Sequence, residues 1–174
     1  MLSQYAYLNA VFVVLSLLGP QSQASGYPHA HGSVEVELVL ESNGLMTGRL
    51  FGAIDGFLPF EHAPKTEAQR RQLLELQQHL TRLDWLLTVN PEGQCLSKTM
   101  RADSSLFRAR VKSGHADLEV QFSLQCASPS LVRIISFPVF VNAKRLKKIE
   151  LEYVGPQGQS KAVLSPRKPQ FVLP

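Results

Sequence analysis

The 174-residue chain lacks the short motifs that mark the common enzyme classes. It has no Gly-x-Ser-x-Gly turn for a serine nucleophile, no His-Glu-x-x-His zinc motif and no glycine-rich phosphate loop. Paired carboxylates occur only as alternating residues of predicted strands, where a solvated sheet face explains them. These absences disfavour an enzyme, and we expect the chain to bind a ligand or a partner instead.

Charged side chains are absent from residues 1–24. An apolar run from Leu8 to Leu18 lies in this segment, and Ser22-Gln23-Ala24 has the small-x-small pattern that signal peptidase prefers. The run is about half the roughly 20 apolar residues that span a bilayer. We therefore predict a cleaved secretory signal over residues 1–24, a single domain over 25–174 and no retained membrane anchor. The first basic residue is Arg49, so either the initiator amine supplies the usual charge before the run or translation starts elsewhere.

Cysteine is scarce, because Cys95 and Cys126 are the only two. In an exported protein they most simply form one disulfide, which would close a loop of about 30 residues and stabilise the fold by roughly 3–4 kcal/mol. A zinc site built from both thiolates is the alternative.

The net charge of +4 raises the question of nucleic acid, but the basic residues are dispersed. Only Lys144-Arg145 and Lys147-Lys148 form a cluster. A solvated strand entrance explains that cluster, and contact with a partner or an anionic membrane is the alternative. We expect no nucleic-acid binding.

Alternating apolar and polar residues predict a strand-rich fold. A strand over His29–Glu41 is followed by Asn43-Gly44, a strong hairpin signal, and a returning strand from Leu45 to about Ala53. A second hairpin is expected from Phe107 to Cys126, with Ser113-Gly114 as its turn. Further strands are expected around Ile149–Tyr153, at 162–164 and at 171–173. The apolar segment 131–141 fits either a buried strand or a short helix.

One amphipathic helix is predicted from Thr66 to about Leu86. Thr66 and Gln69 form a capping-box pattern, and Glu67 suits the positive end of the helix dipole. An apolar stripe follows at intervals of three and four residues: Leu73, Leu76, Leu80, Leu83 and Leu87. Such a stripe usually covers one face of a sheet. We therefore predict an α+β fold in which one long helix covers a mainly antiparallel sheet built from hairpins.

Histidines supply the candidate metal ligands. His29 and His31 head the first predicted strand, where residues two apart point to the same side and could hold one ion together. His115 and Asp117 have the same spacing at the head of another strand. Glu61 and His62 would both reach an ion only through a turn, at the entrance to the helix.

Each of these residues also has a plain structural interpretation. His29 and His31 could belong to a frayed N-terminus, His115 to a turn, and His62 to a loop in which it caps a backbone carbonyl. A hydrolytic zinc enzyme would need an open coordination position and a general base, for which Glu61 is the candidate.

Several motifs in order resemble the ZrgA-like family of zinc-regulated exported proteins of Gram-negative bacteria. They are His29-x-His31-Gly32, Phe60-Glu61-His62-Ala63-Pro64, Cys95, His115-Ala116-Asp117-Leu118 running to Cys126, and Ile149-Glu150 leading to Gly155-Pro156-x-Gly158-Gln159. The resemblance spans nearly the whole chain after the predicted signal. It implies a periplasmic zinc-binding protein that takes part in zinc acquisition beside an ABC-type importer, and it implies no enzymatic activity.

One departure from the family pattern bears on the ligand set. Many members carry a histidine-rich tract between the first cysteine and the His-Ala-Asp motif, whereas Leu96 to Gly114 contains no histidine here. Zinc binding would then depend on the ordered positions His29, His31, Glu61, His62, His115 and Asp117. The sequence predicts a periplasmic protein of zinc acquisition or buffering, and the alternative is a metal-free periplasmic interaction module of the same fold.

Overall fold

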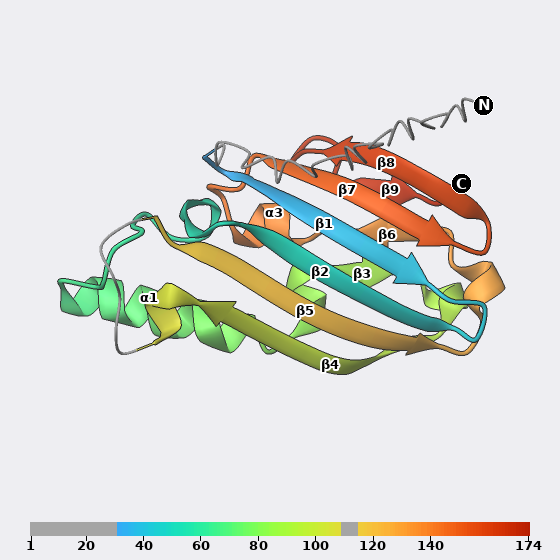
Figure 1. The fold of residues 1–174 in the computed structure, drawn as a ribbon, viewed down its shortest axis with the longest axis horizontal. Coiled ribbons are helices and arrows are strands. Elements are labelled where there is room, and N and C mark those ends of the chain that lie inside the picture. The colour runs from blue at the N-terminus through green and yellow to red at the C-terminus, as the bar shows by residue number, and fades with distance from the viewer. Residues whose placement is uncertain (1–30, 109–114) are drawn as a thin grey trace, which may run out of the picture.

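Six strands form the main sheet of the computed structural model, which describes residues 31–108 and 115–174 (Figure 1). Their order is β4-β5-β2-β1-β7-β8, and every neighbouring pair is antiparallel except the parallel pair β1 and β7. The strands are β1 (Ser33–Leu40), β2 (Leu45–Ala53), β4 (Cys95–Ser104), β5 (Asp117–Cys126), β7 (Lys148–Gly155) and β8 (Gly158–Leu164). The predicted signal segment and His29 lie outside the described residues.

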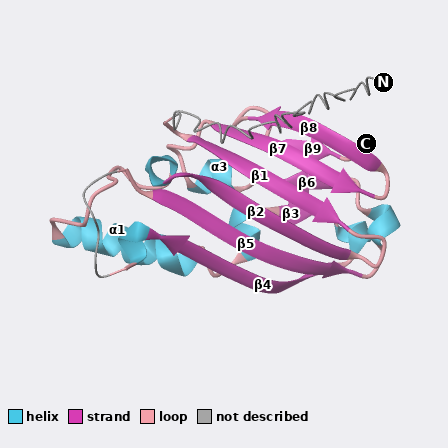
Figure 2. Cartoon of the chain, viewed as in Figure 1, coloured by secondary structure: helices cyan, strands magenta, loops and turns pink. Residues whose placement is uncertain are grey.

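A second layer lies behind this sheet, as Figures 1 and 2 show. It contains a three-stranded sheet in the order β3-β6-β9, formed by β3 (Thr88–Val89), β6 (Ile134–Ser136) and β9 (Gln170–Val172). Its helices are α1 (Glu67–His79), α2 (Leu83–Leu86) and α3 (Val139–Asn142). Short 3-10 turns connect elements of the fold at 54–56, 91–93, 105–107 and 129–131. The predicted α+β class is confirmed. Within the described residues, no helix is long and apolar enough to cross a membrane.

The core lies between these layers because the strands alternate. In β1, every second side chain is buried, and β5 and β7 repeat the pattern against the same layer. Burial is nearly complete for Val36 and Leu38 in β1, Leu118 and Val120 in β5, and Ile149 and Leu151 in β7. The alternation that predicted each strand therefore also determines which face of the sheet is buried.

The opposite face of the sheet is polar. Arg49 of β2 donates to Glu119 of β5 at 2.8 Å, and this hydrogen bond holds the pKa of Glu119 below its usual value. Both side chains are more than a third exposed. The pair therefore adds little to stability, but it favours the observed pairing of β2 with β5.

Helix α1 begins as predicted but ends earlier. The Thr66 hydroxyl accepts from the Gln69 amide and the Gln69 side chain accepts from the Thr66 amide, completing the capping box. The prediction of one helix to about Leu86 is wrong, because the chain turns after His79 and Thr81 Oγ1 donates to the Gln78 carbonyl. The stripe nevertheless stays buried throughout: Leu73, Leu76, Leu80, Leu83 and Leu87.

The hairpin expected from Phe107 to Cys126 is only half right. Its second strand is β5, but Phe107 ends a 3-10 turn, and residues 109–114 lie outside the described part of the chain. Strand β5 is already paired with β4 on one side and β2 on the other. Among the described residues, the preceding strand that pairs with β5 is therefore β4, which ends at Ser104.

The two cysteines and segment 131–141 also follow the predictions from the sequence. Cys95 and Cys126 form the predicted disulfide, with an S–S distance of 2.05 Å, between directly opposed residues of β4 and β5. Segment 131–141 contains both of the structures that its composition allowed, strand β6 and helix α3, with Pro138 capping the helix.

Candidate metal site

The candidate site lies where β1 begins, β2 ends and β5 begins. His31 precedes β1, Asp55 lies in the 3-10 turn Ile54–Gly56 after β2, and His115 precedes β5. The antiparallel register brings Gly52 of β2 opposite Val34 of β1, and Ala53 opposite Asp117 of β5. The neighbouring strands therefore place these chain ends at the same edge of the sheet.

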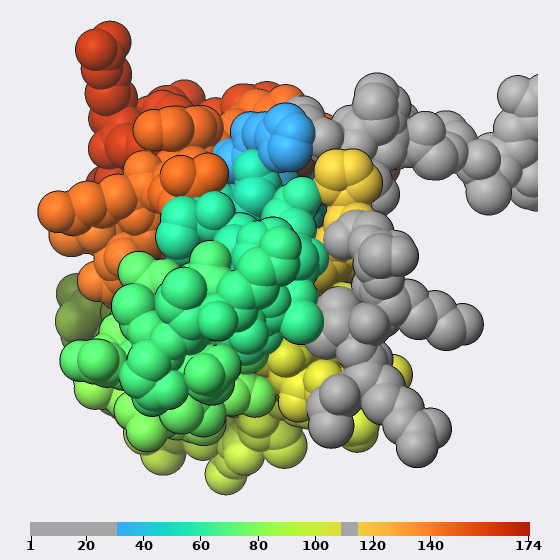
Figure 3. Space-filling model, turned by 90° about the vertical axis from the view of Figure 1, so that its left-hand side faces the viewer, coloured from blue at the N-terminus to red at the C-terminus, as the bar shows by residue number. Residues whose placement is uncertain are grey.

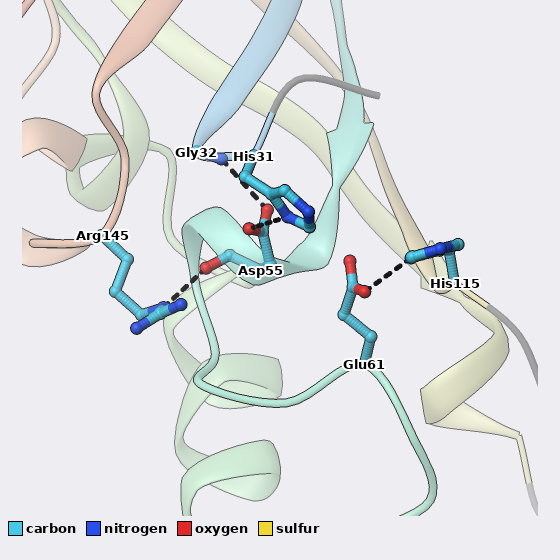
Figure 4. Close-up of polar contacts among 6 residues, drawn as sticks. All are labelled: His31, Gly32, Asp55, Glu61, His115 and Arg145. Carbon is cyan, nitrogen blue, oxygen red and sulfur yellow. Dashed lines mark hydrogen bonds and ion pairs between the residues drawn. The ribbon is translucent and has the colours of Figure 1, made fainter. Parts of the chain in front are cut away.

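His31 and Asp55 form the first carboxylate–histidine pair. Nδ1 of His31 lies 2.7 Å from Oδ2 of Asp55, and the Gly32 amide donates to Oδ1 at 3.1 Å (Figure 4). Arg145 Nε also contacts Asp55, donating to its backbone carbonyl oxygen at 2.8 Å. Asp55 is 7% exposed, so its carboxylate is fixed from several directions while the imidazole stays accessible.

Gly32 makes this arrangement sterically feasible. Its φ of +69° lies in the left-handed region that favours glycine. A Cβ at this position would also lie 2.7 Å from the Arg145 carbonyl oxygen. Glycine therefore allows the chain between His31 and β1 to pass close to the Arg145 segment.

His115 and Glu61 form the second pair. Nδ1 of His115 lies 2.7 Å from Oε2 of Glu61, a residue of the loop before α1. The other Glu61 oxygen, Oε1, is buried and has no hydrogen-bond partner in the described part of the chain. Since buried polar atoms are nearly always paired, this oxygen is a candidate for binding a cation.

The two pairs face one another. Figure 4 shows the Glu61 carboxylate between the His31–Asp55 pair and His115. One ligand atom each from His31, Asp55 and Glu61 lie within 4.8 Å of one another. The rings of His31 and His115 are 6.5 Å apart between centroids. Imidazole nitrogen and carboxylate oxygen are both good zinc ligands, so the cluster has a suitable composition for this ion.

The hydrogen bonds at Nδ1 also determine which imidazole nitrogen is available. Metal-binding histidines commonly donate one ring N–H to a carboxylate, which orients the ring and leaves the other nitrogen for the metal. His31 and His115 both have this arrangement, and both side chains are 72% exposed. The Nε2 atoms can therefore meet an ion at the surface.

The structure brings together His31, Glu61 and His115 of the predicted ligands. His62 points elsewhere, since its Nδ1 lies 2.9 Å from the Ala63 carbonyl oxygen and its ring packs near Phe60. Asp117 begins β5 and is half-buried. Neither Asp117 nor His115 is among the three residues whose ligand atoms cluster, and His115 joins them through Glu61. His29 lies outside the described residues, so its part in ligation stays a prediction.

Asp55 was not among the metal ligands predicted from the sequence. Strand register could have found it, because Val34 pairs with Gly52, and extending the same antiparallel register by three residues places His31 opposite Asp55. Asp55 stands just beyond a predicted strand end and carries no pattern of its own. It becomes a candidate only once the two strands are aligned.

Comparison with known proteins identifies the family of the chain. A search of curated proteins finds no significant match. A family model described as "ZrgA family zinc uptake protein" matches residues 28–173. The match includes both carboxylate–histidine pairs and extends over nearly the whole described structure. The chain therefore belongs to the ZrgA family of zinc uptake proteins.

Proposed function

We propose that this protein is exported to the periplasm, where it binds zinc for acquisition or buffering and works beside an ABC-type zinc importer. Membership of a zinc uptake family implies a role in transport rather than catalysis. The predicted signal segment and the disulfide support export, because disulfides persist in oxidising compartments such as the periplasm.

The observation that carries the zinc-binding proposal is the pair of oriented imidazoles. Each Nδ1 is held by a carboxylate at 2.7 Å, so Nε2 is free to accept zinc without reorganising the ring. Tetrahedral zinc needs about four ligands, or three with a water. His31 and His115 would supply two of them through Nε2, and His29 or water would supply the rest, because Asp55 and Glu61 lie on the Nδ1 side of the two rings.

The surface position of the site suits acquisition better than permanent storage. Both imidazoles are mostly exposed, while the carboxylates behind them are largely enclosed. An ion bound by the imidazoles would stay within reach of water and of ligands from another molecule. We expect reversible binding near one ion per chain.

The test is a zinc titration of the protein spanning residues 25–174, with the disulfide formed, against a His31→Ala/His115→Ala double variant. We expect the double variant to lose at least the roughly 10- to 100-fold in affinity that follows loss of an orienting partner. A His79→Ala variant is the matched control, because His79 stacks on Trp85 with centroids 5.3 Å apart, outside the site. A His62→Ala variant tests the remaining predicted ligand.

Undiminished zinc binding by the double variant would refute this site. If the unaltered protein bound no zinc, the metal-free interaction module would become the working hypothesis. Circular dichroism of each variant separates loss of ligands from loss of folding, since both histidines are exposed and their truncation leaves the core intact.

A further inference from the structure

A group of basic side chains borders the candidate metal site. Lys144, Arg145 and Lys147, which we call the basic patch, lie in the segment between α3 and β7, and all are exposed. Figure 3 shows this segment in orange beside the start of β1 in blue and the turn after β2 in teal. The patch and the site therefore share one face of the molecule.

Direct contacts tie the basic patch to the site. The Lys147 amide donates to the Gly32 carbonyl at 2.7 Å, and Gly32 follows His31 in the chain. Arg145 donates to the Asp55 carbonyl. The Lys147 side chain also lies against Gly32, since its Cγ would be 3.2 Å from a Cβ placed there. The position of the patch relative to the imidazoles is thus set by the backbone.

The charges of the basic patch are not neutralised within the fold. Among residues 31–108 and 115–174, no ion pair includes Lys144, Arg145 or Lys147. Their neighbour Lys148 differs, because it pairs with Glu150 at 2.5 Å. Lys147 Nζ reaches only the Lys144 carbonyl, at 3.5 Å. These cations therefore act on whatever approaches the site from solvent.

Capture of free zinc does not explain the basic patch. Like charges repel, so cations beside the site lower the local concentration of Zn²⁺ and slow its arrival. The same charges attract an anionic surface and raise its rate of association. Because the imidazoles beside the patch are mostly exposed, ligands carried by such a surface could reach an ion held there.

We propose that the basic patch docks the acidic face of a zinc-exchanging protein, so that carboxylate or imidazole ligands of that protein meet the ion held at His31 and His115. This inference rests on the proposed zinc-binding function. An anionic membrane is the weaker candidate, because polybasic membrane-binding segments usually carry about four to eight basic residues. The patch has three, because the adjacent Lys148 pairs with Glu150, and they lie beside the proposed metal ligands.

The probe is a fluorescent peptide of aspartate and histidine residues, compared with a peptide in which asparagine replaces every aspartate. Binding is measured by anisotropy, first without zinc and then with the zinc-loaded protein. The test variant is Lys144→Glu/Lys147→Glu, which leaves Arg145 and its bond to Asp55 intact. The control is Lys98→Glu/Arg133→Glu, which makes the same charge change at two exposed positions, one within β4 and one directly before β6.

We expect the unaltered protein to bind the aspartate peptide, the test variant to bind it roughly tenfold more weakly at low ionic strength, and the control to differ little. Zinc affinity of the test variant should not fall, because the substitutions remove cations that repel Zn²⁺ and leave the proposed ligands in place. Equal effects of the test and control variants would overturn the docking surface. Tighter binding of phosphatidylglycerol vesicles than of the peptide, lost in the test variant, would overturn it in favour of a membrane.

These measurements also separate the two proposals. If the protein fails to bind zinc but its binding of the aspartate peptide depends on Lys144 and Lys147, only the metal site fails. If the protein binds zinc but its affinity for the aspartate peptide is the same in the test variant, only the docking surface fails.

Discussion

At the candidate site, burial differs between each histidine and its carboxylate. Asp55 is 7% exposed and the Glu61 side chain 19%, whereas both imidazoles are 72% exposed. The enclosed carboxylates therefore hold the imidazole rings in a fixed orientation, and the rings are exposed to solvent. Loss of such an orienting partner typically lowers metal affinity about 10- to 100-fold.

Asp55 offers the sharpest test of this arrangement. In Asp55→Asn, the amide oxygen can still accept from the Gly32 amide, but an NH₂ group replaces the oxygen that faces Nδ1 of His31. We expect zinc affinity to fall about 10- to 100-fold, while the melting temperature stays close to that of the unaltered protein because the side chain keeps its shape. Competition titration with a chromogenic chelator measures the affinity.

A control for Asp55→Asn is Glu67→Gln, which removes an exposed carboxylate paired with Arg70 of the same helix, away from the site. It should leave zinc affinity unchanged. If Asp55→Asn behaved in the same way, Asp55 would be neither a ligand nor an orienting partner.

Residue types were easier to predict than their partners. His31 and His115 stood out because histidine is rare and both precede alternating strands, and the structure brings them together. The partner of His31 could not be found from local pattern, because Asp55 lies 24 residues away and depends on strand register. His62 had a stronger local signal than Asp55, yet it turns to the adjacent Ala63 carbonyl.

At the scale of elements, the spacing of apolar residues predicted which face of a helix or strand is buried, but it predicted poorly where these elements end. The leucine spacing continues through the turn after His79, so the stripe alone could not show that the helix ends there. Alternation likewise predicted β5 but not its neighbours. Strands adjacent in sequence often pair, and β5 does pair with β4, the strand before it, but its other neighbour is β2, which no local pattern indicates.

The docking of α1 on the sheet can be tested with two leucines of the same helix. Leu76 is 5% exposed and Leu74 is 58% exposed. Leu76→Ala should lower the free energy of unfolding by about 2–4 kcal/mol, because it removes buried methyl groups and leaves a cavity. Leu74→Ala should change it by less than about 0.5 kcal/mol. Urea titration followed by circular dichroism measures both, and equal effects would show that α1 does not bury this stripe.

At the scale of the whole molecule, the metal site and the disulfide occupy opposite ends of the main sheet. The site lies where β1 begins, whereas Cys126 donates its amide to Gly44 in the turn where β1 passes into β2. Strand β2 runs between the two regions, with Ala53 at one end and Leu45 at the other. Stability and zinc binding should therefore respond separately to changes at the disulfide.

Removing the disulfide tests this separation. A Cys95→Ala/Cys126→Ala variant releases a link between residues 31 apart in sequence, which should cost about 3–4 kcal/mol in the free energy of unfolding. Because alanine leaves no thiolate, it adds no competing zinc ligand. We expect denaturant titration to show the lost stability, while zinc titration at a temperature where the variant remains folded gives unchanged affinity. A parallel loss of zinc affinity in the folded variant would mean that the disulfide end determines the geometry of the site through β2, and that the two ends act as one unit.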